Sequence, residues 1–77
     1  MTAKVRFFAS LQQQLSMESI DIDVRPGMSA ADVWDLATSQ RERPAKMLCA
    51  INLEYASLQQ PVSDGDEIAF FPPVTGG

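Results

Sequence analysis

The residues best suited to chemistry lie at the end of this chain. The segment from Ala69 to Gly76 carries no charged side chain, and the sequence closes on Gly76-Gly77 behind the pair Pro72-Pro73. Two prolines favour an extended stem that loses little entropy when it is held straight, and residues without a Cβ can thread a narrow passage. The α-carboxylate of Gly77 is ionised at neutral pH, so it reacts only after one oxygen becomes a leaving group.

Activation of this carboxylate defines the chemistry that we expect. An acyl phosphate or acyl-adenylate would make the carbonyl carbon electrophilic, and a sulfur nucleophile would then leave a thiocarboxylate. A thiocarboxylate is itself a nucleophile, which can be carried to another site. We therefore predict an extended tail over residues 72–77, in which Val74 and Thr75 complete the stem and Gly77 is the reactive residue.

The composition argues against most other catalytic chemistry. The sequence has no histidine, so it offers no Ser-His or Cys-His pair and no imidazole ligand, and we predict neither a metal site nor a bound cofactor. Its one cysteine, Cys49, excludes an internal disulfide and lies in the apolar run Met47–Ile51, which favours a buried core residue. With 77 residues, the chain is one small domain with little room for an internal substrate pocket.

The charge and the length of the apolar runs limit the partners. The net charge is −4 and the basic residues are dispersed along the chain, which argues against nucleic acid. No apolar stretch approaches the length of a membrane span. One thiol and no signal sequence predict a reducing, cytoplasmic environment.

The first half of the chain supplies three short elements. Alternating polar and apolar residues predict strands over residues 4–9 and 18–24, and helical spacing predicts two turns over residues 10–15. Ser10 is the expected N-cap of this helix. The side chains expected to face inward are Val5 and Phe7, then Leu11 and Leu15, then Ile20, Ile22 and Val24.

A longer helix is predicted after the turn at residues 25–27. Ser29 is its expected N-cap, with Asp32 placed to return a hydrogen bond and to favour the helix dipole. The helix should run to about Gln40 or Arg41, because Pro44 opposes much continuation. The predicted inward stripe consists of Ala30, Val33, Trp34, Leu36 and Ala37.

The second half of the chain predicts the remaining strands. Residues 46–52 suggest a central buried strand, and residues 52–57 an irregular turn or a short edge strand that contains Tyr55. Gly65 can take a positive φ in a tight turn over residues 63–66. The last strand covers residues 67–71 and stops at Pro72, which cannot donate to a ladder. This order predicts an α+β domain with one long helix lying across a mixed sheet.

Two aromatic doublets predict an exposed patch near the tail. Successive strand side chains point to opposite faces, so Phe7-Phe8 and Phe70-Phe71 must each place one ring outside the core. The alternation places Phe8 and Phe71 outside, close together if the first and last strands are neighbours. With Val74 they would form an apolar patch at the root of the tail. Such a patch favours a partner interface over the alternatives, a second small cluster or a self-dimer.

Three segments suggest a family: Val5–Ala9, Ala50–Asn52 and the long block Asp64–Gly77. On these segments the chain resembles MoaD, the small sulfur-carrier subunits of molybdopterin synthase, within the MoaD/ThiS group of ubiquitin-like proteins. The last block is specific, because ubiquitin and ThiS share the Gly-Gly end but not the Phe-Phe-Pro-Pro stem. The resemblance implies a β-grasp domain over residues 1–71 and an extended tail over residues 72–77.

The resemblance also implies a cycle of partners. An E1-like, MoeB-like enzyme would adenylate the Gly77 carboxylate with ATP, and a sulfur donor such as a cysteine desulfurase or a rhodanese would convert it to a thiocarboxylate. The tail would then enter the MoaE-like large subunit and donate sulfur to precursor Z (cyclic pyranopterin monophosphate), forming the molybdopterin dithiolene. This chain would be the non-catalytic subunit of a heterotetrameric synthase. Hydrophobic contacts in the family would involve Phe8, Phe71 and Tyr55.

Three alternatives remain beside this interpretation. A sulfur carrier of another pathway, of the thiamine type, would use the same activated terminus. A ubiquitin-like modifier would instead be joined through Gly77 to lysines of target proteins. A plain interaction module would use the tail only as a linker.

Overall fold

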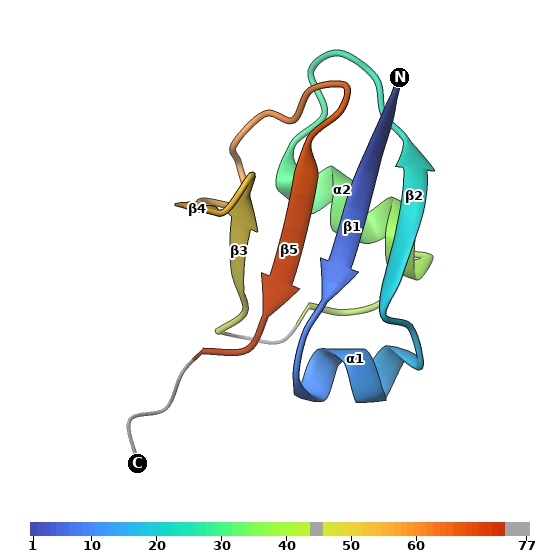
Figure 1. The fold of residues 1–77 in the computed structure, drawn as a ribbon, viewed down its shortest axis with the longest axis vertical. Helices are drawn as coiled ribbons and strands as arrows, with labels where there is room; N and C mark the ends of the chain where they lie inside the picture. The colour runs from blue at the N-terminus through green and yellow to red at the C-terminus, as the bar shows by residue number, and fades with distance from the viewer. Residues whose placement is uncertain (44–45, 74–77) are drawn as a thin grey trace.

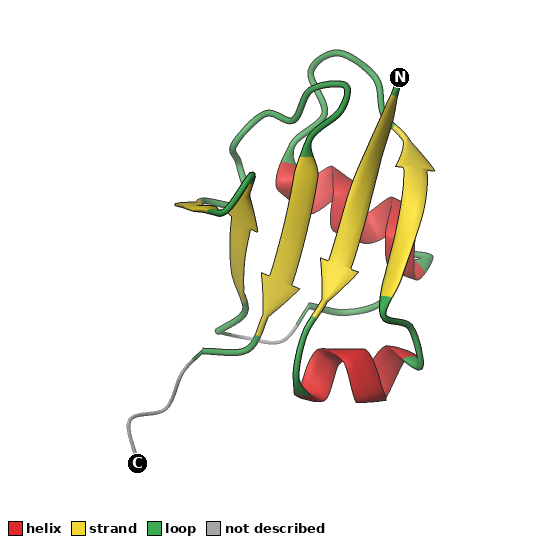
Figure 2. Ribbon diagram, viewed as in Figure 1, coloured by secondary structure: helices red, strands yellow, loops and turns green. Residues whose placement is uncertain are grey.

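The computed structural model describes residues 1–43 and 46–73 of the chain. A five-stranded mixed sheet carries a long helix across one face and a short helix at one end (Figures 1 and 2), as expected for an α+β domain. The sheet order is β2-β1-β5-β3-β4. The elements are β1 (Thr2–Phe7), α1 (Ser10–Leu15), β2 (Ser19–Asp23), α2 (Ala30–Thr38), β3 (Leu48–Ile51), β4 (Glu54–Ala56) and β5 (Glu67–Phe71).

The first and last strands are neighbours at the middle of the sheet. β1 and β5 run parallel, with Phe7 opposite Phe70, while the other strand pairs are antiparallel. Both strands therefore end at the same edge of the sheet, beside α1 (Figure 1). This pairing brings the residues after Phe7 and those after Phe70 to one place.

The core lies between the inner face of the sheet and α2, and it is built around three aromatic rings. The Trp34 ring meets the rings of Phe70 and Phe7 edge-on, with centroids 5.2 Å and 5.9 Å away, and the two phenylalanine rings stack at 6.0 Å. All three side chains are fully buried. The indole Nε1–H donates to the carbonyl oxygen of Arg41 at 2.6 Å, so the one polar atom of this cluster is satisfied.

The start of α2 has the predicted capping box. The backbone N–H of Asp32 donates to the Ser29 hydroxyl oxygen at 3.3 Å, and the backbone N–H of Ser29 donates to the Asp32 carboxylate at 2.9 Å. The next two orphan N–H groups, those of Ala30 and Ala31, donate to carbonyl oxygens of the 57–61 loop. These bonds fix the helix against that loop.

The end of α2 differs from the prediction. The helix ends at Thr38 rather than at Gln40 or Arg41, because Ser39 and Gln40 take left-handed φ angles of 58° and 64°. This turn brings the Arg41 carbonyl oxygen back to the Trp34 indole.

The predicted inward position of Leu36 is wrong, since its side chain is 56% exposed. Each helical residue advances the direction of the side chain by about 100°, which places Leu36 about 60° beyond Val33 and outside the buried arc. The other members of the predicted stripe are buried: Ala30, Val33, Trp34 and Ala37.

Four further details depart from the sequence-based expectations. Ala9, at φ 54°, is the N-cap of α1 without a side-chain hydrogen bond, so Ser10 is the first helical residue and not the cap. β1 covers residues 2–7 rather than 4–9, and β3 starts at Leu48 rather than Lys46, with only Cys49 fully buried. β2 lies at the edge of the sheet, where Ile20 and Ile22 are only half-buried.

The other strand predictions are confirmed. Residues 54–56 form the short edge strand that contains Tyr55, and β5 covers the predicted residues 67–71. Gly65 takes φ 85° in the preceding turn. Within residues 1–43 and 46–73, neither helix has the length and apolarity needed to cross a membrane.

Candidate functional site

The two aromatic doublets are oriented as predicted. Phe7 and Phe70 point into the core, whereas Phe8 is 43% exposed and Phe71 is half-buried on the opposite face. The backbone N–H of Phe8 donates to the Phe70 carbonyl oxygen at 3.2 Å, which continues the β1–β5 pairing one residue past β1. The parallel register therefore brings Phe8 and Phe71 to the same end of the outer face.

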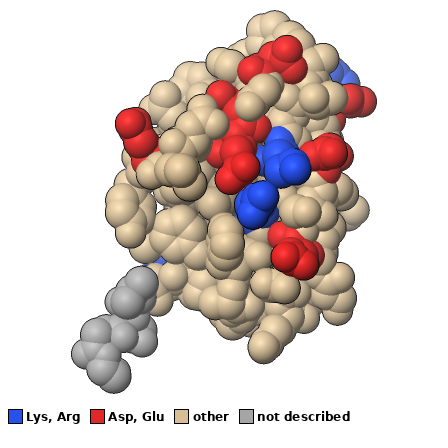
Figure 3. All heavy atoms as spheres, in the orientation of Figure 1, with Lys and Arg blue, Asp and Glu red and all other residues tan. Residues whose placement is uncertain are grey.

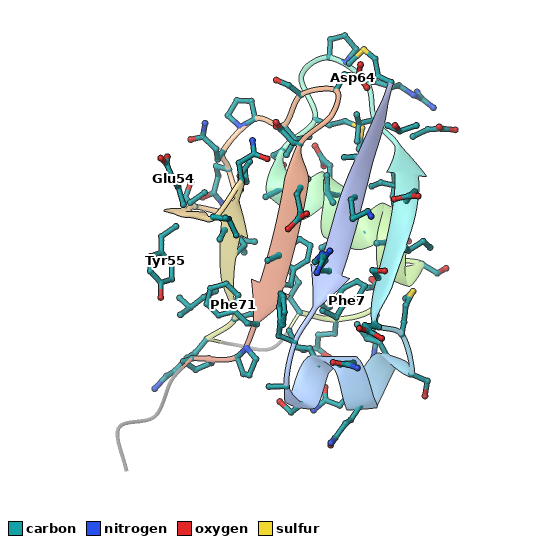
Figure 4. All side chains as sticks on the ribbon, viewed as in Figure 1. Phe7, Glu54, Tyr55, Asp64 and Phe71 are labelled. Atoms are coloured by element: carbon teal, nitrogen blue, oxygen red, sulfur yellow. The ribbon has the colours of Figure 1, made fainter. Side chains whose placement is uncertain are left out.

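Phe8 and Phe71 line one apolar depression of about 290 Å³ on this face, together with Leu53, Tyr55, Ala50 and Ala69. Ala50 is opposite Ala69 on one side and opposite Tyr55 on the other. These two small side chains lower the surface between the larger ones. The Tyr55 and Phe71 rings lie 5.9 Å apart between centroids, and Figure 4 shows Phe71 near the end of β5 with Tyr55 beside it.

All three predicted interface residues, Phe8, Phe71 and Tyr55, are therefore brought together. Three further lining residues, Leu53, Ala50 and Ala69, were not predicted from the sequence. Successive side chains along a strand point to opposite faces, so Ala50 and Ala69 lie on the face opposite Cys49 and Phe70. This alternation could have predicted both alanines as the floor of the depression. Leu53 had no comparable signal, because its place depends on the turn between β3 and β4.

Among the described residues, none of those that line the depression carries a charge. Figure 3 shows that Lys, Arg, Asp and Glu side chains gather over the upper and right-hand parts of this face, while its lower left part is almost entirely uncharged. Arg6 and Glu67, 3.6 Å apart and both exposed, form an ion pair on the neighbouring part of the face. An uncharged hollow bordered by charges is typical of the centre and rim of a protein interface.

The depression lies at the point where β5 leads into the predicted tail. Pro72 follows Phe71 and ends the strand, as predicted, and both Pro72 and Pro73 are half-buried. The predicted threading residues Val74, Thr75 and Gly76 and the reactive residue Gly77 lie outside the described residues, as does the contribution of Val74 to the patch.

Cys49 has the structural role predicted for it. Its side chain is 2% exposed, and its Sγ–H donates to the Ala56 carbonyl oxygen at 3.1 Å across the β3–β4 pair. Burial raises the pKa of this thiol above its ordinary value, which opposes formation of the reactive thiolate. In the described part of the chain, no group of three or more His, Cys, Asp or Glu side chains could hold a metal ion.

The mixed five-stranded sheet with a long helix across one face is the β-grasp fold of ubiquitin-like proteins. The chain belongs to the ThiS family, whose model matches residues 5–77.

Known proteins agree with this assignment. The chain is 37% identical to the molybdopterin synthase sulfur carrier subunit of Escherichia coli (strain K12), with 96% of this chain and 98% of the relative aligned. Among solved structures it is similar to SAMP1 from Haloferax volcanii, with a TM-score of 0.84, 25% identity and full coverage of both chains. It is also similar to a chain in the complex of subunits 1 and 2 of molybdopterin-converting factor from Helicobacter pylori 26695, with a TM-score of 0.68, 26% identity and full coverage of both chains.

Proposed function

We propose that this chain is the sulfur-carrying small subunit of a molybdopterin synthase. The observation that carries the proposal is the 37% identity to the Escherichia coli sulfur carrier subunit over nearly the whole of both chains. The likeness to a chain of the Helicobacter pylori complex supports a large, MoaE-like subunit as the partner. The uncharged hollow lined by Phe8, Phe71 and Tyr55 supports the same partner, because it offers an apolar dock beside the start of the tail.

The proposed chemistry resides in the Gly77 carboxylate. A MoeB-like enzyme with ATP would convert it to an acyl-adenylate, with pyrophosphate as the other product. The terminal sulfur of a donor persulfide, carried by a cysteine desulfurase or a rhodanese, would attack the adenylate and displace AMP. A thiol would then reduce the resulting acyl disulfide, which leaves a thiocarboxylate on Gly77 and a disulfide on the donor. In the large subunit, the thiocarboxylate sulfur would be transferred to precursor Z, and hydrolysis would return Gly77 to its carboxylate form.

In this scheme the chain binds and presents a reactive group, and its partners supply the catalytic side chains. The absence of histidine from the sequence and the buried, protonated Cys49 support that division. The carrier itself would hold no cofactor, and ATP would be consumed only by the activating enzyme.

Mass spectrometry of the protein from growing cells tests the proposal. Exchange of one oxygen for sulfur raises the mass by about 16 Da, and this species is expected to disappear when the activating enzyme is deleted. Removal of Gly77 is expected to abolish molybdoenzyme activity in cells. Activity that survives this deletion would contradict the proposal.

A second function, covalent modification of proteins through Gly77, is favoured by one observation. The fold matches SAMP1 over its full length, and the Haloferax volcanii protein is described as a small archaeal modifier protein. The same mass spectrometry separates the two functions, because a modifier gives isopeptide-linked adducts on target lysines. Adducts without a thiocarboxylate species would favour the modifier.

A further inference from the structure

The turn between β3 and β4 has an unusual residue at its tip. Ile51 is opposite Glu54, so the turn consists of two residues, Asn52 and Leu53, with φ angles of 52° and 71°. Positive φ at both positions defines a type I′ turn, which favours Asn followed by Gly. Asn52 fits its position, but Leu53 carries a Cβ and a branched side chain in a conformation that glycine adopts without strain.

Leu53 is also unfavourable for solvation. Its side chain is 90% exposed, the highest exposure among the large hydrophobic residues of the described chain. A backbone penalty and an exposed apolar side chain therefore coincide at one residue. Glycine or asparagine at this position would relieve both, which favours a role for leucine in contact with a partner.

Hydrogen bonds fix the turn that carries Leu53. The Asn52 side-chain amide donates to the Asp66 carboxylate at 2.9 Å, and its carbonyl oxygen accepts from the backbone N–H of Glu67 at 3.0 Å. The Asn52 backbone N–H donates to the Glu67 carbonyl oxygen at 2.8 Å. Asp66 is itself held by the backbone N–H of Ser63 at 2.7 Å. Leu53 is thus presented on a fixed support, which reduces the entropy lost when its side chain is immobilised by a partner.

Leu53 is continuous with the proposed docking surface. Leu53 lines the same depression as Phe8, Tyr55 and Phe71. It lies in the β3–β4 turn, which forms one end of this depression. We infer that Leu53 is an anchor residue, whose side chain inserts into an apolar pocket of the large subunit when that subunit covers the depression. This inference rests on the proposed function, and it extends the interface from the end of β5 to the β3–β4 turn.

A second copy of the chain is a poorer occupant than the large subunit. The chain carries a net charge of −4, and the exposed Glu54 follows Leu53 directly. Two copies that met through this surface would bring like charges together around an apolar centre, which disfavours association. A different protein can offer neutral or basic residues around its pocket.

The test compares Leu53→Gly with the unchanged protein and with Leu36→Gln. Glycine removes the side chain and restores the preferred Asn-Gly turn, so the melting temperature is expected to stay the same or rise. The dissociation constant of the complex with the large subunit, measured by calorimetry, is expected to increase by about 10- to 100-fold. Leu36 is an exposed leucine on α2, away from the depression, and Leu36→Gln is expected to leave binding unchanged.

Three outcomes separate the possibilities. Binding of Leu53→Gly within about twofold of the unchanged protein, while Phe71→Ala binds more weakly, overturns the anchor role but leaves the proposed function intact. No binding of the unchanged protein to the large subunit counts against the proposed function itself. A dimer in sedimentation that Leu53→Gly converts to a monomer would assign the surface to a second copy and overturn the inference.

Discussion

Phe70 and Phe71 are adjacent in the sequence but should differ sharply in what they contribute. Phe70 is fully buried between the rings of Trp34 and Phe7, at 5.2 Å and 6.0 Å between centroids. Truncation of such a side chain leaves a cavity, so Phe70→Ala is expected to lower the free energy of unfolding by about 3–5 kcal/mol. Phe71 is half-buried on the outer face, and Phe71→Ala is expected to cost less than about 1.5 kcal/mol.

The loss at Phe70 is large relative to the whole domain. A chain of 77 residues has a free energy of unfolding of about 4–12 kcal/mol. Each kcal/mol lost lowers the melting temperature by about 4–8 °C in a domain of this size. A loss of about 3 kcal/mol, at about 4 °C for each kcal/mol, lowers the melting temperature of Phe70→Ala by about 12 °C or more. The melting temperature of Phe71→Ala should stay close to that of the unchanged protein.

Phe71 is expected to contribute more to binding than it does to stability. Phe71→Ala should weaken association with the large subunit by about 1–3 kcal/mol, because it removes one wall of the depression. Urea unfolding followed by circular dichroism gives the stabilities, and calorimetry with the large subunit gives the affinities. Equal losses of stability in the two variants would refute the assignment of the strand faces. An unchanged affinity for Phe71→Ala would refute the interface.

The remaining predictions concern the cap of α2 and the buried thiol. Ser29→Ala removes the hydroxyl that accepts from Asp32 and should lower the free energy of unfolding by about 1 kcal/mol, measured by urea unfolding against the exposed Ser19→Ala; equal effects would refute the cap. Cys49 should resist alkylation by iodoacetamide in the folded protein and react readily in urea, and rapid labelling of the folded protein would contradict its burial. Burial raises the pKa of the Cys49 thiol, so the stability that this group contributes is fully present below its ordinary pKa of 9.0 and is lost as the pH rises above that value. The melting temperature should therefore fall with increasing pH in this range, and Cys49→Ala should lack this part of the fall.

Local patterns predicted those parts of the fold that depend on neighbouring residues. The doublet Phe70-Phe71 could be assigned to faces because strand side chains alternate, and Ser29 could be assigned as a cap because its bond to Asp32 spans one helical turn. The end of α2 depends instead on the Trp34 indole, which binds the Arg41 carbonyl oxygen after the chain has turned. This hydrogen bond depends on tertiary packing, so no local sequence pattern indicates where the helix ends.

The same distinction applies to the docking surface. Phe8 and Phe71 were predictable because each belongs to a strand with clear alternation. Leu53 was not predictable, because its exposure depends on a two-residue turn. The register of this turn is fixed by hydrogen bonds of Asn52 with Asp66 and Glu67, which are far from it in the sequence. Sequence patterns therefore indicated the aromatic part of the surface but not its outer end.

The parallel pairing of β1 with β5 has a consequence for how the chain folds as it is made. β1 leaves the ribosome well before its central partner β5, because all the other helices and strands of the fold lie between them in the sequence. Pairing of such distant segments requires closure of a long loop, which slows folding relative to local contacts. A chain interrupted before residue 67 lacks both the central strand and Phe70 of the core cluster, so it should be left unfolded and open to proteolysis. The proposed docking surface therefore forms only on chains that have been synthesised through β5, so an incomplete chain is not expected to bind the partner.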